Sequence, residues 1–72
     1  MEKTKKIDGF LCTFMEYDDG DSNNCYVEKG RFHASLALLQ HLGEFDDGEG
    51  NSLPIHESTI DKIEQWAILQ GY

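Results

Sequence analysis

The sequence predicts a single α+β domain in which two helices pack against a small antiparallel sheet, in the order ββαβα. Two apolar runs flank a turn-forming segment at residues 18–24, which indicates a β-hairpin. A leucine-rich run at 31–42 and a second run at 58–70 have helical spacing. The chain has 72 residues, which is enough for one domain with a thin core.

The first predicted strand covers residues 9–17, with Phe10, Cys12 and Phe14 on one face. The other face is also apolar, so we expect it to contact another element or another chain. Residues 18–24 are rich in Asp, Asn and Gly and predict a turn, after which residues 25–28 form the returning strand. Residues 1–8 are predicted to be a flexible basic tail, which leaves 9–72 as the domain.

Gly30 ends the returning strand, and residues 31–42 predict a helix that Gly43 closes. The broad apolar face of this helix comprises Phe32, Ser35, Leu36, Leu38, Leu39 and Leu42. Residues 44–51 form a second acidic loop. Residues 52–56 are a short extended piece, which Pro54 confines to an edge of the sheet.

The closing helix has Ser58 as its predicted N-cap and Gly71 as its end. Its inward stripe comprises Ile60, Ile63, Trp66 and Ala67, and Ile68 and Leu69 lie outside that stripe. Two short helices cover too little area for all of these apolar side chains. We therefore predict a homodimer or an apolar partner contact through the second face of the first strand and the two stray helix residues, that is Leu11, Met15, Tyr17, Ile68 and Leu69.

The charge balance favours a basic protein as partner. The formal net charge is −8, and from residue 7 onward 13 acidic side chains face only three basic ones. Such a field repels nucleic-acid backbones and anionic membranes, so neither is expected as a direct partner. No apolar run has the length of a membrane span, and the basic start lacks a signal-peptide pattern. We expect a cytoplasmic protein in which Cys12 and Cys25 are free thiols.

Two acidic segments, 16–24 and 44–52, repeat the pattern acid, aromatic, Asp-Asp-Gly, acid, small, Asn. Turn chemistry that draws twice on the same residues explains the repeat as well as a function does. The functional hypothesis is that two acidic tips form one negative surface, each held in place by an aromatic residue. The partner-binding residues would then be Tyr17 and Phe45 as anchors, with the charges of Asp18, Asp19, Asp21, Asp46, Asp47 and Glu49.

Catalytic and metal-binding patterns are weak. An EF-hand loop that starts at Asp19 or at Asp47 lacks both the glycine at its sixth position and the glutamate at its twelfth. His33 and His41 diverge on the predicted helix, and their spacing requires no zinc site. The sequence therefore predicts no enzyme, no cofactor and no metal site. A small calcium- or zinc-binding protein is the alternative of another class.

From Ser35 onward the chain resembles the core of the Skp1 and BTB/POZ family. The resemblance rests on the leucine-rich helix, the acidic loop, Leu53-Pro54, and a closing helix with Lys62-Ile63 and Gln65-Trp66. It implies an adaptor core as an alternative function. The main hypothesis is a small acidic protein-binding module, an inhibitor, immunity-type protein or adaptor. Its size and charge are similar to those of small inhibitory proteins of phages and mobile elements.

Overall fold

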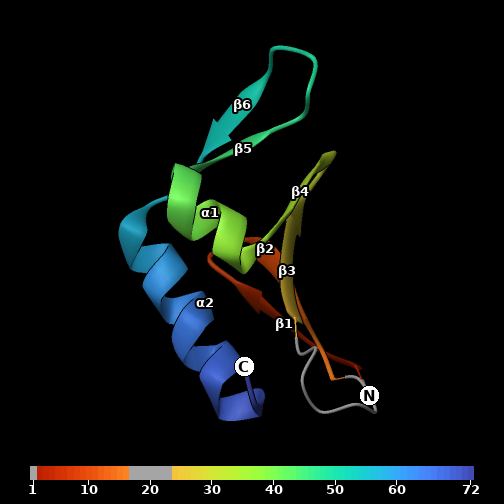
Figure 1. Cartoon of the computed structure of the whole chain (residues 1–72), viewed down its shortest axis with the longest axis vertical. Helices are drawn as coiled ribbons and strands as arrows, with labels where there is room; N and C mark the ends of the chain where they lie inside the picture. The colour runs from red at the N-terminus through yellow and green to blue at the C-terminus, as the bar shows by residue number, and fades with distance from the viewer. Residues whose placement is uncertain (1, 17–23) are drawn as a thin grey trace.

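A four-stranded antiparallel sheet forms one layer of the protein (Figure 1). The computed structural model describes residues 2–16 and 24–72. The strands follow one another as a meander, in the spatial order β1-β2-β3-β4. Their bounds are β1 Glu2–Ile7, β2 Phe10–Met15, β3 Asn24–Lys29 and β4 Phe32–Ser35.

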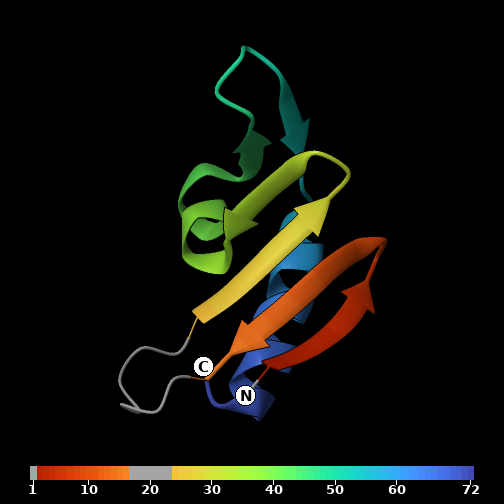
Figure 2. The same cartoon turned by 90° about the vertical axis from the view of Figure 1, so that its right-hand side faces the viewer.

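Two helices form the second layer, and both cover the same face of the sheet. Helix α1 (Leu36–Leu42) packs on β3 and β4, and helix α2 (Glu57–Gln70) packs on β1 and β2. Between the helices the chain forms a separate two-stranded hairpin of β5 (Glu44–Asp46) and β6 (Ser52–Pro54). Figure 2 shows that the other face of the four-stranded sheet has no helix over it.

The α+β class is confirmed, but the predicted order was wrong: the observed order is ββββαββα. The predicted hairpin corresponds to β2 and β3, which pair antiparallel with Cys12 opposite Val27 and Phe14 opposite Cys25. The sequence did not reveal β1 and β4. The extended piece at 52–54 is also not an edge strand of the main sheet, because it pairs only with β5.

Strand β1 lies in the segment that the sequence predicts to be a tail. Asp8 and Gly9 both have positive φ, 51° and 88°, as a two-residue type I′ hairpin turn requires, and the turn pairs Ile7 with Phe10. Five of the six residues of β1 are exposed, so the strand has no apolar pattern. Lysines on an edge strand also discourage pairing with another sheet.

Strand β4 occupies the first part of the predicted helix at 31–42. Gly30, with φ of 60°, stands first in a two-residue turn that pairs Lys29 with Phe32, as in type II′ turns. The helix begins only after Ser35, whose Oγ accepts a hydrogen bond of 3.2 Å from the Leu38 N–H. Its end is as predicted, since Gly43 is left-handed and donates to the Leu39 carbonyl.

Helix α2 ends as predicted but begins earlier. His56, not Ser58, is the N-cap residue, and its carbonyl accepts hydrogen bonds from the N–H groups of Thr59 and Ile60. Gly71 ends the helix. The predicted inward stripe is buried except for Trp66, which is partly buried. No helix in the part of the chain that the structure describes has the length and apolar character needed to span a membrane.

The core lies between the sheet and the helices. The Phe45 side chain comes from β5 and is fully buried there, with its ring stacked on that of Phe10 at 5.7 Å between centroids. Leu36 and Leu39 of α1 and Ile63 of α2 fill the centre. The β5–β6 hairpin is therefore fixed to the domain by an aromatic contact with β2.

Candidate functional site

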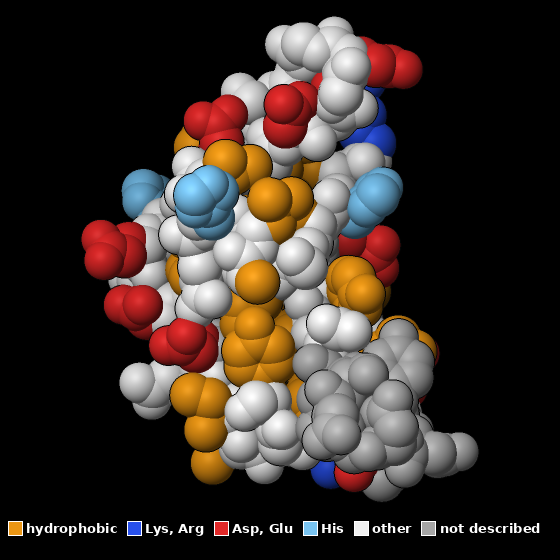
Figure 3. Space-filling model, viewed as in Figure 1, with side chains coloured by type: hydrophobic (Ala, Val, Ile, Leu, Met, Phe, Trp, Pro, Cys, Tyr) orange, Lys and Arg blue, Asp and Glu red, His pale blue; other side chains and the backbone are white. Residues whose placement is uncertain are grey.

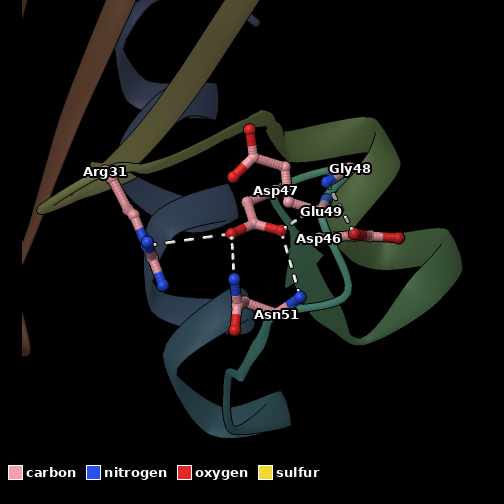
Figure 4. Close-up of polar contacts among 6 residues, drawn as sticks. All are labelled: Arg31, Asp46, Asp47, Gly48, Glu49 and Asn51. Atoms are coloured by element: carbon pink, nitrogen blue, oxygen red, sulfur yellow. Dashed lines mark hydrogen bonds and ion pairs between the residues drawn. The ribbon is translucent and has the colours of Figure 1, made fainter.

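The turn between β5 and β6, which we call the acidic turn (residues 46–51), holds three of the predicted partner-binding acids (Figure 4). Asp46 Oδ1 accepts a hydrogen bond of 2.8 Å from the Gly48 N–H. Asp47 Oδ1 accepts bonds from the N–H groups of Glu49 at 2.8 Å and Asn51 at 3.1 Å. Asp47 Oδ2 accepts a bond of 2.8 Å from the Asn51 side-chain amide.

The Asp47 carboxylate therefore stabilises the turn and contributes little negative charge to the surface. Its side chain is only 9% exposed, and Arg31 Nε lies 3.8 Å from Oδ2. The hydrogen bond from the Glu49 N–H lowers the pKa of the Asp47 carboxyl, followed by the Asn51 side-chain amide. Asp46 and Glu49 are exposed and carry the negative charge that this turn presents outward.

Phe45, the predicted anchor of the acidic turn, lies in β5 directly before that turn. It is fully buried, so it contacts no partner directly and instead fixes β5 against Phe10 and Phe32. The other predicted tip lies outside the described residues, and with it Tyr17, Asp18, Asp19 and Asp21. The ends of β2 and β3 that flank it lie at the end of the molecule opposite the β5–β6 hairpin (Figures 1 and 2).

The residues predicted to form a dimer or partner contact are not brought together. Leu11 and Met15 are partly buried and lie on the sheet face that points away from the helices, since their neighbours Phe10, Cys12 and Phe14 face the core. Ile68 and Leu69 are 57% and 82% exposed on α2, in the other layer. One flat interface cannot include both pairs, because the sheet and the core separate them.

The helices carry an exposed apolar surface that was not predicted from the sequence. Leu38 and Leu42 were predicted to face inward, but they are 47% and 49% exposed. Leu36 and Leu39 alone fill the space beneath the two-turn helix α1. The signal was present in the sequence, because four of the seven residues of α1 are leucines, which is more than one contact with a sheet can bury.

A shallow groove lies between α1 and α2. Its volume is about 370 Å³, and its walls include Leu42 of α1, the buried Ile55 and Ile60, and the acidic pair Glu57 and Asp61 of α2. Within the described residues neither of these two acids has an ion-pair partner. The groove thus combines an apolar floor with negative charge at its rim.

Asp8 links the turn between β1 and β2 to α2. Its carboxylate accepts a hydrogen bond of 2.8 Å from the Thr59 hydroxyl and lies 3.0 Å from Lys62 Nζ. These two hydrogen bonds, that of Thr59 first, lower the pKa of the Asp8 carboxyl. The carboxylate thus has a structural role in holding β1 and β2 against the helix.

The two cysteines are free and buried in the core. Burial raises the pKa of Cys12 to about 12, with a further contribution from Cys25, and raises the pKa of Cys25 to about 11. A thiol with such a pKa is not a nucleophile near neutral pH. Across residues 2–16 and 24–72, no three His, Cys, Asp or Glu side chains are grouped as a metal site requires.

Comparisons of the chain with protein-family models, curated proteins and solved structures found no match. No family model therefore supports the resemblance to the Skp1 and BTB/POZ family.

Proposed function

We propose that the chain is a non-enzymatic, acidic protein-binding module, an inhibitor or adaptor that engages a basic surface of a protein partner in the cytoplasm. The observation that carries the proposal is the placement of its charges. Acidic side chains lie along α2 at Glu57, Asp61 and Glu64, and Asp46 and Glu49 extend from the acidic turn. Figure 3 shows acidic side chains along the outer margin of the helical layer and near the hairpin.

This arrangement favours association with a positively charged surface. Charges of one sign spread over one side of a small protein create a field that steers oppositely charged partners and speeds their encounter. Basic side chains Lys3, Lys5 and Lys6 are confined to β1, at the edge of the sheet. Lys62 of α2 pairs with Asp8 and does not line the groove beside α1, so a basic partner that approaches the groove meets little repulsion.

The proposal is tested by the salt dependence of binding and by amide substitutions. Proteins that the chain captures from its host are identified, purified and titrated at low and high ionic strength. The variant in which Asp18, Asp19, Asp21, Asp46 and Asp47 become Asn and Glu49 becomes Gln removes the acidic tips. A second variant, Glu57→Gln with Asp61→Asn, removes charge from α2.

We expect a basic partner whose association rate falls steeply with added salt, and at least one of the two variants should weaken it while remaining folded. The proposal fails if purified partners bind with no salt dependence and both folded variants bind as the parent does. Because Asp47 shapes its turn, a copy of the first variant that retains Asp47 separates loss of charge from loss of structure.

A further inference from the structure

Apolar side chains remain exposed on the outer side of both helices. Leu38 and Leu42 are one turn apart on α1, and Ile68 lies near the end of α2. Leu69 and Tyr72 continue this exposure to the C-terminus, at 82% and 41%. We call Leu38, Leu42 and Ile68, together with the groove between the helices, the helical face.

A polar contact joins the two helices beside the helical face. The Gln40 amide of α1 donates a hydrogen bond to Glu64 Oε2 of α2, so these exposed side chains bridge the helices. Ile68 follows Glu64 by one helical turn and therefore lies on the same side of α2, toward α1. Figure 3 shows hydrophobic side chains that run from α1 toward the C-terminal half of α2.

Acidic residues precede Ile68 on the same side of α2. Glu57, Asp61 and Glu64 are spaced by four and three positions, which places them along one side of α2. Glu57 and Asp61 also line the groove beside Leu42. An occupant of the helical face must therefore present apolar side chains with positive charge beside them.

We propose that the helical face binds a basic amphipathic helix of a partner protein. Its apolar residues would pack on Leu38, Leu42 and Ile68, and its Lys or Arg side chains would pair with Glu57 and Asp61. Two adjacent helices leave a furrow that suits a third helix, whose anchors recur every three or four residues. The inference rests on the proposed function, and it names the face and the form of the partner.

A second copy of the chain is a poorer occupant by charge. Two helical faces placed against each other would bring the acids of one α2 close to those of the other, without compensating cations. The chain's basic cluster is on β1, which is a strand and has its lysines on both sides. Neither helix of this chain is basic.

The test uses two synthetic peptides of identical Leu and Lys composition, each about four helical turns long. In the first, Leu recurs at helical spacing; in the second, the order is scrambled so that no apolar face forms. Binding of the fluorescently labelled peptides to the full chain is measured by anisotropy. The scrambled peptide has the same charge and so reports unspecific attraction to the net charge of −8.

Three variants locate the binding. Leu42→Asn with Ile68→Asn removes apolar contact, and Glu57→Gln with Asp61→Asn removes the acidic rim. Glu2→Gln with Glu28→Gln removes the same charge from exposed positions on the sheet and serves as the matched control. Each variant is checked for its fold by circular dichroism. Glu57 and Asp61 are exposed, so Glu57→Gln with Asp61→Asn should remain folded. That variant still tests the inference if Leu42→Asn with Ile68→Asn unfolds the protein.

We expect the amphipathic peptide to bind about tenfold or more tightly than the scrambled one, and the first two variants to lose roughly that advantage. The control should stay within about twofold of the parent. Equal binding of the two peptides, or an equal loss in the control, overturns the inference but does not contradict the proposed binding of a basic partner. Dimerisation of the parent that the Leu42→Asn, Ile68→Asn variant abolishes also overturns it. Absence of salt-dependent binding to any basic protein would instead contradict the proposed function.

Discussion

Asp8 and Thr59 lie 51 positions apart in the sequence, yet the Thr59 hydroxyl donates a hydrogen bond of 2.8 Å to the Asp8 carboxylate. The Asp8 residue that accepts it has a left-handed backbone, with φ of 51°. Lys62, one turn further along α2, donates to the same carboxylate. The turn between β1 and β2 is thus joined to the helix that covers it.

We predict that Asp8→Asn destabilises the protein at neutral pH and has less effect in acid. Folding lowers the pKa of this carboxyl below its ordinary value of 3.8, so its interactions stabilise the fold above that value and are lost as the pH falls through the folded-state pKa. Asn tolerates the positive φ, so the change removes charge without backbone strain. Urea unfolding of both proteins at about pH 7 and about pH 3 measures the difference, and an equal difference at the two pH values would refute this role.

Phe45→Ala should cost about 3–5 kcal/mol of unfolding free energy. The ring is fully buried and contacts Phe10 and Phe32, so truncation leaves a cavity at the junction of β2, β4 and β5. Most of the stability of so small a domain would be lost. The midpoint of urea unfolding checks the size, and Phe45→Leu should lose less. A cost below about 1 kcal/mol for Phe45→Ala would show that the hairpin adds little to the core.

Asp47→Asn should destabilise the acidic turn, whereas Asp46→Asn with Glu49→Gln should leave stability unchanged or slightly raised. Asp47 accepts bonds from Glu49 and Asn51 that favour its charged form, and its pKa is lowered accordingly. The double variant keeps that network and relieves repulsion in an acidic protein. Thermal melting compares the variants, and NMR titration of the Asp47 carboxyl should give a midpoint below the ordinary 3.8. Equal melting temperatures for all three proteins would contradict the structural role of Asp47.

The two thiols should resist alkylation in the folded protein. Burial raises the pKa of Cys12 to about 12 and that of Cys25 to about 11, so almost no thiolate forms near pH 8. Iodoacetamide labelling followed by mass spectrometry should therefore proceed only through unfolding, at a rate that urea increases. Rapid labelling of either cysteine in the native protein would mean that the strand pair β2–β3 opens.

Calcium, zinc and EDTA should not change the melting temperature. No metal-binding group of side chains exists within the described residues, and the Asp47 oxygens already accept hydrogen bonds from their own turn. A metal that binds the folded state at 100 times its dissociation constant would add about 2.7 kcal/mol, which is a shift of several degrees in a domain of this size. Such a shift would favour the metal-binding alternative over the protein-binding module.

Elements whose core residues recur at the spacing of a strand or a helix were predictable from the sequence. Elements that lack such a pattern were not. Buried residues alternate along β2 and along residues 24–28 of β3, and α2 has its inward stripe and its terminal Gly71. Strand β1 has only Ile7 buried, so the Asp8-Gly9 turn was its single local signal. Strand β4 was hidden because Phe32 and Leu36 reach the same core from two different elements, which imitates the spacing of one helix.

The candidate site was predictable only in its composition. The acidic turn is visible in the sequence, but whether a carboxylate binds its own loop, as Asp47 does, or points to solvent depends on the backbone path. Exposure of Leu38 and Leu42 likewise depends on how much of α1 the sheet covers. Neither quantity follows from residue type or spacing.

The meander also keeps the sequence separation between paired strands of the main sheet short. Every pairing in the main sheet joins strands adjacent in sequence, and the two-residue turns at 8–9 and 30–31 close two of the three pairings with minimal loss of chain entropy. Domains dominated by such short-range contacts have low contact order and fold fast. The docking of α2 on β1 and β2 is the long-range step, which brings residues some fifty positions apart into contact. The domain therefore combines a sheet that can assemble strand by strand with a terminal helix whose arrival completes the core.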